Sequence, residues 1–95
     1  MLLFEWDPIK AKKNESIHGV SFDEASTVFG DTLSLTIYGP LHSSEEDRLI
    51  LIGNSVNNRI LIVVHTERRD KIRIISARKA TKYERKHYEE ISKRP

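Results

Sequence analysis

Hydrophobic residues recur at two spacings along this chain, and each spacing predicts one kind of element. Near the N-terminus, residues 2–6 are short, apolar and aromatic-rich, as expected of a strand. Asp7 and Pro8 then have the residue types of a helix N-cap and of a first helical position. Gly19 tolerates the left-handed conformation that closes a helix. We therefore predict a strand, then a helix from Pro8 to about His18.

Two further helices are predicted by the spacing of a capping box. Ser21 and Glu24 have this spacing, and apolar residues follow at helical intervals through Phe29. Thr81 and Glu84 repeat it near the C-terminus, which predicts a last helix from residue 82 to about residue 92. The apolar positions of that last helix form only a thin stripe, so it either docks weakly or binds a partner.

The middle of the chain reads as four strands, at residues 33–38, 48–53, 59–67 and 71–77. Asn57-Asn58 and Arg69-Asp70 lie where tight turns join antiparallel neighbours, because Asn and Asp tolerate turn backbone angles. We predict one α+β domain over residues 1–95. Its N-terminal strand and two helices precede a four-strand antiparallel meander and a C-terminal helix.

Composition excludes several classes of protein. The chain has no Cys, which removes disulfides, thiolate nucleophiles and Cys-rich zinc sites and favours the cytoplasm. Its four His residues are scattered without a close pair, so we expect no metal site. No apolar run approaches the length of a membrane span, and the acidic start argues against a signal peptide. A Gly-rich phosphate loop and a nucleophile elbow are also missing, which argues against nucleotide-driven and acyl-transfer enzymes.

Charge is distributed unevenly along the chain. Residues 1–58 carry four Lys and Arg against nine Asp and Glu, a net charge of −5, whereas residues 59–95 carry twelve against five, a net charge of +7. Such asymmetry suggests a polyanionic partner, most simply nucleic acid. An ordinary solvated basic face accounts for the same numbers.

The predicted hairpin over residues 63–78 carries the strongest candidate chemistry. Two apolar arms meet at a tip crowded with ionisable side chains. Cleaving RNA without a metal requires a base for the 2′-hydroxyl, a cation for the phosphorane and an acid for the leaving oxygen. Glu67 or His65 is a candidate base, and Arg73 or Arg78 a candidate cation. In the alternative interpretation, Glu67 forms only a surface ion pair with a neighbouring arginine.

Strand register decides whether these residues meet. With Arg69-Asp70 as the turn, Thr66 lies opposite Arg73 and Glu67 lies opposite Ile72. Glu67 and Arg73 then point to opposite faces of the sheet, although a shift of one residue reverses this relation.

Candidate substrate contacts surround the same tip. They are Arg68, Arg69 and Lys71, whose charge suits phosphates, and Trp6, whose ring could stack on a base. A lone Trp on a short first strand is more often a core residue.

Motifs throughout the chain resemble those of a known family. The matching segments are Phe4-Glu5-Trp6-Asp7-Pro8, Lys10 with Asn14, His18 to Ala25, Val28-Phe29, His42-Ser43, Glu46, Arg48, Gly53, Ser55, His65 to Arg68, Arg73 to Thr81, Glu84-Arg85 and Tyr88-Glu89. Together these motifs resemble the BrnT family of toxins over nearly the whole chain. Ser44-Glu45-Glu46 and Asn57-Asn58-Arg59 depart from the family pattern by lacking Gly, which affects loop shape.

The resemblance implies the toxin half of a type II toxin-antitoxin module. Such a toxin is a small ribonuclease of RelE-like fold that degrades RNA and so blocks translation and growth, with no metal or cofactor expected. It also implies a BrnA-type antitoxin with a ribbon-helix-helix part, through which alone the toxin reaches operator DNA. Carried over to this chain, catalysis falls first on Glu67 and Arg73, and then on Arg78, His65 and Lys12.

Two other functions remain compatible with the residues. A non-catalytic basic module would bind nucleic acid in a salt-sensitive manner without cleaving it. A pure interaction protein would show neither cleavage nor salt-dependent binding.

Overall fold

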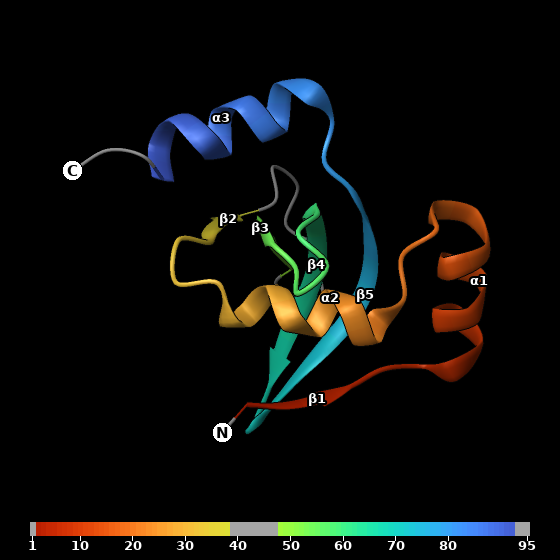
Figure 1. The fold of residues 1–95 in the computed structure, drawn as a ribbon. Coiled ribbons are helices and arrows are strands. Elements are labelled where there is room, and N and C mark those ends of the chain that lie inside the picture. The colour runs from red at the N-terminus through yellow and green to blue at the C-terminus, as the bar shows by residue number, and fades with distance from the viewer. Residues whose placement is uncertain (1, 39–47, 93–95) are drawn as a thin grey trace.

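Helices cover both faces of a five-stranded sheet in the computed structural model, which describes residues 2–38 and 48–92 (Figure 1). The elements in chain order are β1 (Leu3–Glu5), α1 (Pro8–His18), α2 (Phe22–Thr27), the 3-10 turn η1 (Val28–Gly30), β2 (Leu35–Tyr38), β3 (Leu49–Asn54), β4 (Ile60–Arg68), β5 (Lys71–Lys79) and α3 (Lys82–Ser92). The predicted order of elements is confirmed. The predicted ends of the strands and of the first and last helices are shifted by at most two residues.

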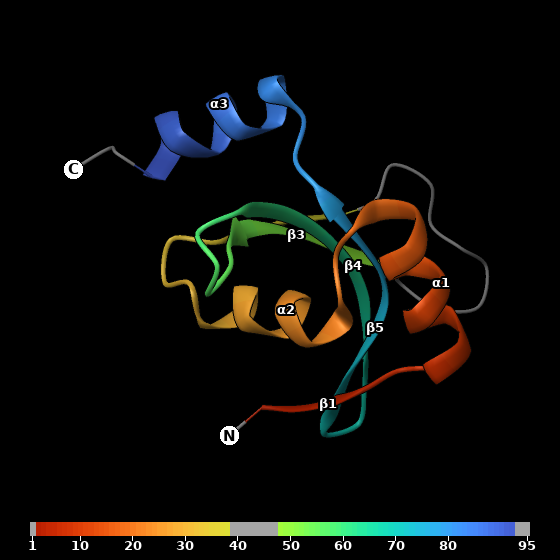
Figure 2. The same ribbon diagram turned by 45° about the vertical axis from the view of Figure 1, so that its right-hand side comes forward.

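Strand pairing confirms the predicted meander and places the first strand beside its end. The order in the sheet is β1-β5-β4-β3-β2, with antiparallel pairing from β2 through β5. β1 pairs parallel with β5 at the edge. The β4–β5 hairpin therefore carries its tip next to β1, as the lower part of Figure 2 shows.

α1 is held by its ends and by one buried amide. Asp7 caps it by accepting from the Ile9 backbone N–H (2.8 Å), and Gly19 closes it with φ 68°, as predicted. Ile9 and Ile17 are 80% and 63% exposed, so the helix has little apolar face to bury. Asn14 supplies the attachment that the sequence analysis did not anticipate, through hydrogen bonds that reach β5.

The main hydrophobic core lies between α2 and the sheet. Phe22, Ala25 and Val28 pack there as predicted, against apolar residues of β3, β4 and β5. Gly53 of β3 is required by this packing, since a Cβ there would lie 2.9 Å from Val28 Cγ1. The approach of η1 to the sheet is therefore too close for any larger residue.

Only half of the capping box predicted for α2 forms. Ser21 Oγ accepts from the Glu24 N–H (3.0 Å), but the Glu24 carboxylate does not return to the Ser21 backbone. It accepts instead from Arg59 Nε (2.9 Å) and from Ser55 Oγ (2.7 Å) at the β3–β4 turn. The hydrogen bond from Arg59 is the main cause that lowers the pKa of Glu24 to about 2. A charged partner brought close by the fold outcompetes a local backbone N–H.

The same β3–β4 turn has Asn57-Asn58-Arg59 where the pattern of the BrnT family includes a glycine. Asn58 adopts φ 61°, the left-handed conformation for which Asn is one of the better-suited residues. The departure at Asn57-Asn58-Arg59 is thus accommodated, whereas Ser44-Glu45-Glu46 lies outside the described residues, as does His42.

α3 packs on the second face of the sheet. Its capping box is complete, with Thr81 N–H donating to Glu84 Oε1 (2.8 Å) and Glu84 N–H donating to Thr81 Oγ1 (3.1 Å). Tyr88 is buried against the sheet and donates to the Asp31 carboxylate, whereas Tyr83 is 80% exposed. Burial and the Asp31 contact raise the pKa of Tyr88 to about 12. The thin stripe predicted for this helix therefore docks largely through one aromatic residue.

None of the helices in the described part of the chain has the length and hydrophobicity needed to span a bilayer.

Candidate active site at the hairpin tip

A two-residue turn closes the β4–β5 hairpin where the sequence predicts it. Arg68 lies opposite Lys71, and Arg69 and Asp70 connect them. Arg69, rather than Asp70, adopts the left-handed conformation, with φ 60°. This is an uncommon conformation for a residue with a Cβ, and it is held here by the tight connection.

The predicted register is confirmed, and it separates the two leading catalytic candidates. Thr66 pairs with Arg73 and Glu67 pairs with Ile72. Ile72 is buried, so Glu67 lies on the face that the N-terminal helices cover, at its exposed end. Arg73 projects from the other face, because side chains alternate along a strand. The structure does not bring Glu67 and Arg73 together.

A β-bulge decides the position of Arg78. Val64 pairs with Ser76 but His65 pairs with Ile74, so Ile75 is an extra residue on β5. In a regular strand, Arg73 and Arg78 would point to opposite faces because they are five residues apart. The extra residue places both arginines on the face that carries α3.

Four cations and two carboxylates gather around a groove of about 660 Å³ at the tip. Arg73 Nη1 donates to Glu5 Oε2 (3.3 Å), and Arg68 Nη1 lies 3.9 Å from the same oxygen. The groove is lined by Glu5, Arg68, Arg69, Asp70, Lys71 and Arg73. Three of the predicted substrate contacts are therefore brought together with the first candidate cation.

Glu5 is the member of this groove that sequence reasoning missed. It sits opposite Arg73 in the parallel pairing of β1 with β5, and its side chain is 29% exposed. A single acidic residue in a short apolar strand is a weak signal. Its partner strand could not be inferred, because 65 residues separate the end of β1 from the start of β5.

Arg78 is engaged elsewhere. Its guanidinium makes two hydrogen bonds to the Glu84 carboxylate, at 2.8 and 2.9 Å. This pairing raises the pKa of Arg78 and lowers that of Glu84 to about 2. Arg78 thereby fastens the start of α3 to β5 and does not line the groove.

His65 lies in the interior rather than at the surface. It is 3% exposed, and its ring meets that of Phe29 edge-on at 4.8 Å. Burial lowers its pKa, while the Val63 backbone and the charge of Glu67 act in the opposite direction. Its Nδ1 atom has no hydrogen-bond partner among the described residues. A buried, neutral imidazole is not placed to act as a base in the groove.

Trp6 and Lys12 also lie away from the groove. Trp6 packs edge-on against Phe22 with ring centroids 5.9 Å apart, which supports its interpretation as a core residue. Lys12 is exposed on α1 and does not line the groove. Across residues 2–38 and 48–92, no three His, Asp or Glu side chains cluster in a way that could hold a metal ion.

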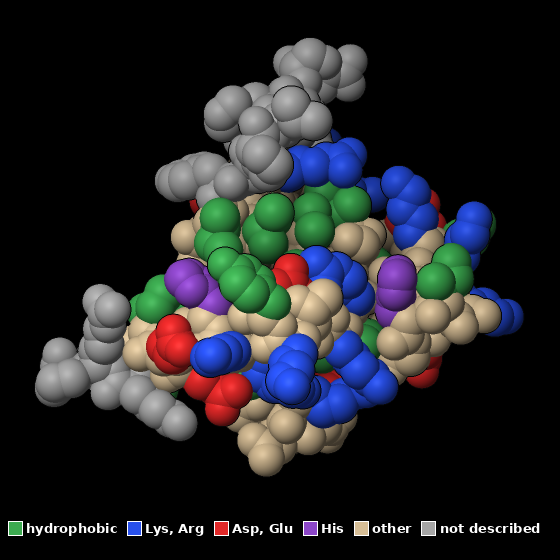
Figure 3. All heavy atoms as spheres, turned by 90° about the horizontal axis from the view of Figure 1, so that it is seen from above, with side chains coloured by type: hydrophobic (Ala, Val, Ile, Leu, Met, Phe, Trp, Pro, Cys, Tyr) green, Lys and Arg blue, Asp and Glu red, His purple; other side chains and the backbone are tan. Residues whose placement is uncertain are grey.

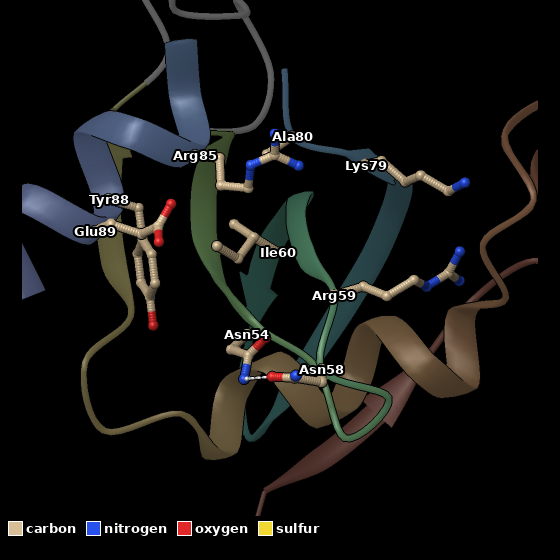
Figure 4. Close-up of a pocket in the computed structure, with 9 residues that line it drawn as sticks. All are labelled: Asn54, Asn58, Arg59, Ile60, Lys79, Ala80, Arg85, Tyr88 and Glu89. Carbon is tan, nitrogen blue, oxygen red and sulfur yellow. Dashed lines mark hydrogen bonds between the residues drawn. The ribbon is translucent and has the colours of Figure 1, made fainter. Parts of the chain in front are cut away.

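A second hollow, of about 440 Å³, lies under α3 (Figure 4). Lys79 and Glu89 lie on opposite sides of it, above Ile60, and Asn54 donates to Asn58 (3.1 Å). Its charged residues are Arg59, Lys79, Arg85 and Glu89, of which the last two belong to α3. Among the described residues that line it, no carboxylate is paired with an arginine as at the tip. The groove at the hairpin tip is the better candidate for binding a phosphate.

Comparison with known proteins agrees with this fold. A crystal structure of the Brucella abortus ribonuclease toxin, BrnT, superposes with a TM-score of 0.63 at 21% sequence identity, covering 86% of this chain and 100% of that chain. None of the curated proteins compared matches the chain. Residues 6–84 match the family described as "Ribonuclease toxin, BrnT, of type II toxin-antitoxin system". This chain therefore belongs to the BrnT family of ribonuclease toxins.

Proposed function

We propose that this toxin cleaves RNA without a metal ion, in the groove at the hairpin tip, and so blocks translation and growth in the cytoplasm. The observation that carries the proposal is the gathering of three further cations, Arg68, Arg69 and Lys71, around the Glu5–Arg73 pair. An RNA backbone brings one negative charge per nucleotide, and a cationic groove at an exposed end of the sheet can receive it.

Arg73 takes the central role in this proposal. Its guanidinium presents several N–H donors in a fixed plane, which suits the oxygens of a phosphorane. Preorganised donors of this kind stabilise charge that develops in the transition state. Arg68, Arg69 and Lys71 hold the flanking phosphates, and their contribution depends on salt concentration.

Cleavage in the presence of a chelator tests the proposal. Purified protein is incubated with RNA and excess EDTA, alongside Arg73→Ala and, as a control, Arg85→Ala, which removes an arginine of α3 outside the groove. We expect wild-type and Arg85→Ala protein to release fragments ending in 2′,3′-cyclic phosphate. Arg73→Ala should be slower by about 100-fold or more. RNA that stays intact but bound would support the non-catalytic binding module instead.

The partner in this proposal is a BrnA-type antitoxin with a ribbon-helix-helix part, through which alone the complex reaches operator DNA. Ile37, Ile50 and Val64 lie opposite one another on β2, β3 and β4, and none of them is fully buried. This apolar row lies between α3 and the row of Thr66 and Arg73. A row of hydrophobic side chains is also visible beside Lys and Arg side chains in Figure 3. An amphipathic antitoxin segment with acidic residues along one side complements this surface.

Co-expression of toxin and antitoxin tests the partner. Size-exclusion chromatography should show one complex, and Ile37→Asp should weaken it while leaving RNA cleavage by the free toxin unchanged. Val56→Asp, at a site that is 75% exposed in the β3–β4 turn, is the matched control. Separate elution of the two wild-type proteins would contradict this part of the proposal.

A further inference from the structure

We propose that Glu5 is the general base of this reaction, an assignment that rests on the proposed function and extends it. The base must lie beside the cation that holds the scissile phosphate, because the attacking 2′-hydroxyl is on the neighbouring ribose. Among the described residues that line the groove, Glu5 is the carboxylate that contacts Arg73.

The backbone fixes this proximity. Parallel pairing places Glu5 directly opposite Arg73, so their side chains leave the sheet on the same face. The Glu5 carboxylate lies 3.3 Å from Arg73 and 3.9 Å from Arg68, and it remains partly exposed to the groove. Glu67 leaves the opposite face of the sheet, and Asp70 belongs to the exposed turn. Neither of them is opposite Arg73.

The chemistry follows from this placement. A phosphate oxygen of the bound RNA contacts the Arg73 guanidinium, while the Glu5 carboxylate takes the proton of the adjacent 2′-hydroxyl. The 2′-oxygen forms a bond to phosphorus as the bond from phosphorus to the 5′-oxygen breaks. The leaving 5′-oxygen takes a proton from water, and Glu5 returns its proton to the resulting hydroxide. The products are a 2′,3′-cyclic phosphate and a 5′-hydroxyl.

A purely structural role for Glu5 predicts a different outcome. If Glu5 only held Arg73 in place, removing its charge would weaken RNA binding and cleavage together. If Glu5 is the base, Glu5→Gln removes one negative charge from the groove and leaves its cations in place. RNA should then bind as tightly as before or more tightly, while cleavage is lost.

The experiment therefore measures binding and cleavage separately on the full chain. Binding is measured with a 2′-O-methyl RNA, which cannot be cleaved, and cleavage is measured in single-turnover reactions with unmodified RNA. The variants are Glu5→Gln, the shortened Glu5→Asp, and the control Glu15→Gln, which removes an exposed carboxylate of α1 outside the groove. Circular dichroism verifies that each variant is folded.

We expect Glu5→Gln to slow cleavage by about 100-fold or more with no loss of affinity. Glu5→Asp should retain part of the activity, and Glu15→Gln nearly all of it. The assignment is overturned if Glu5→Gln cleaves within threefold of wild type, or if it loses affinity and cleavage together. Absence of cleavage by the wild-type protein would overturn the proposed function itself, and Glu5 with it.

Discussion

Replacing Asn14 by Ala should destabilise the protein more than its position on an exposed helix suggests. The Asn14 side chain is buried and donates to the Val20 carbonyl (3.0 Å) and to the Ala77 carbonyl (2.8 Å). It also accepts from the Ala77 N–H (3.2 Å). β1 pairs with β5 only as far as Arg73, so the Asn14 carboxamide serves Ala77 as the peptide group of a neighbouring strand would.

The size of the effect follows from those three hydrogen bonds. Each contributes about 1 kcal/mol net, and the substitution leaves backbone groups without these partners in a buried place. The expected loss in the free energy of unfolding is about 3 kcal/mol. For a domain of this size, that lowers the melting temperature by roughly 12 to 24 °C. Since small domains are stable by only about 5–15 kcal/mol, the loss is a large fraction of the total.

Urea unfolding followed by circular dichroism measures this loss, with Ser16→Ala on the same helix as the control. Ser16 is exposed, so its replacement should change stability by at most about 0.5 kcal/mol. Asn14→Asp is a sharper variant, because a carboxylate still accepts from the Ala77 N–H but cannot donate to either carbonyl. A loss below about 1 kcal/mol for Asn14→Ala would refute the strand-like role of this amide.

Three further substitutions test other parts of the structure. Glu24 has its pKa lowered to about 2, so its ion pair stabilises the fold above about pH 4.5 and is lost as the pH falls toward 2. Glu24→Gln should therefore cost about 3 kcal/mol at pH 7 and progressively less below pH 4.5 in urea titrations. Gly53→Ala should cost about 1–3 kcal/mol in the same assay, because the new methyl group meets Val28. Tyr88→Phe should cost about 1 kcal/mol through its lost hydrogen bond to Asp31, and it should speed hydrogen exchange in α3.

Each of these three predictions has an outcome that would contradict it. A Glu24→Gln deficit that stays constant down to pH 2 would mean that the carboxylate is not ionised and paired as described. Gly53→Ala with unchanged stability would show that η1 moves away from β3 without cost. If hydrogen exchange in α3 is no faster in Tyr88→Phe than in wild type, α3 is held mainly by its other contacts.

Much of the fold could be predicted because its signals are local. Asp7 and Pro8 begin α1 and Gly19 ends it, and the turns at Asn58 and Arg69 join strands whose ends lie within two residues of the predicted ones. Caps and tight turns depend on residues only a few positions apart, so the chain itself carries that information. The register at the hairpin tip was predictable for the same reason, and it was confirmed at Thr66 and Arg73.

The candidate site was only partly predictable, because it depends on contacts between distant segments. Spacing placed Arg68, Arg69, Lys71 and Arg73 near one another, and the structure gathers all four around one groove. Nothing in the local pattern connects that tip to Glu5. His65 and Trp6 pack against Phe29 and Phe22 from other segments of the chain. Arg78 pairs instead with Glu84, six residues further along, at the start of α3.

The sequence by itself determined the helices, the strands, the tight hairpin and the concentration of positive charge near its tip. The tertiary structure decided which charges face one another. Parallel pairing brought Glu5 to Arg73, a bulge at Ile75 brought Arg78 to the face of α3, and Glu24 left its expected cap for a distant arginine. The physical reason is that strand partners and bulges are set by packing over the whole sheet, whereas caps and turns are set by neighbours in the chain.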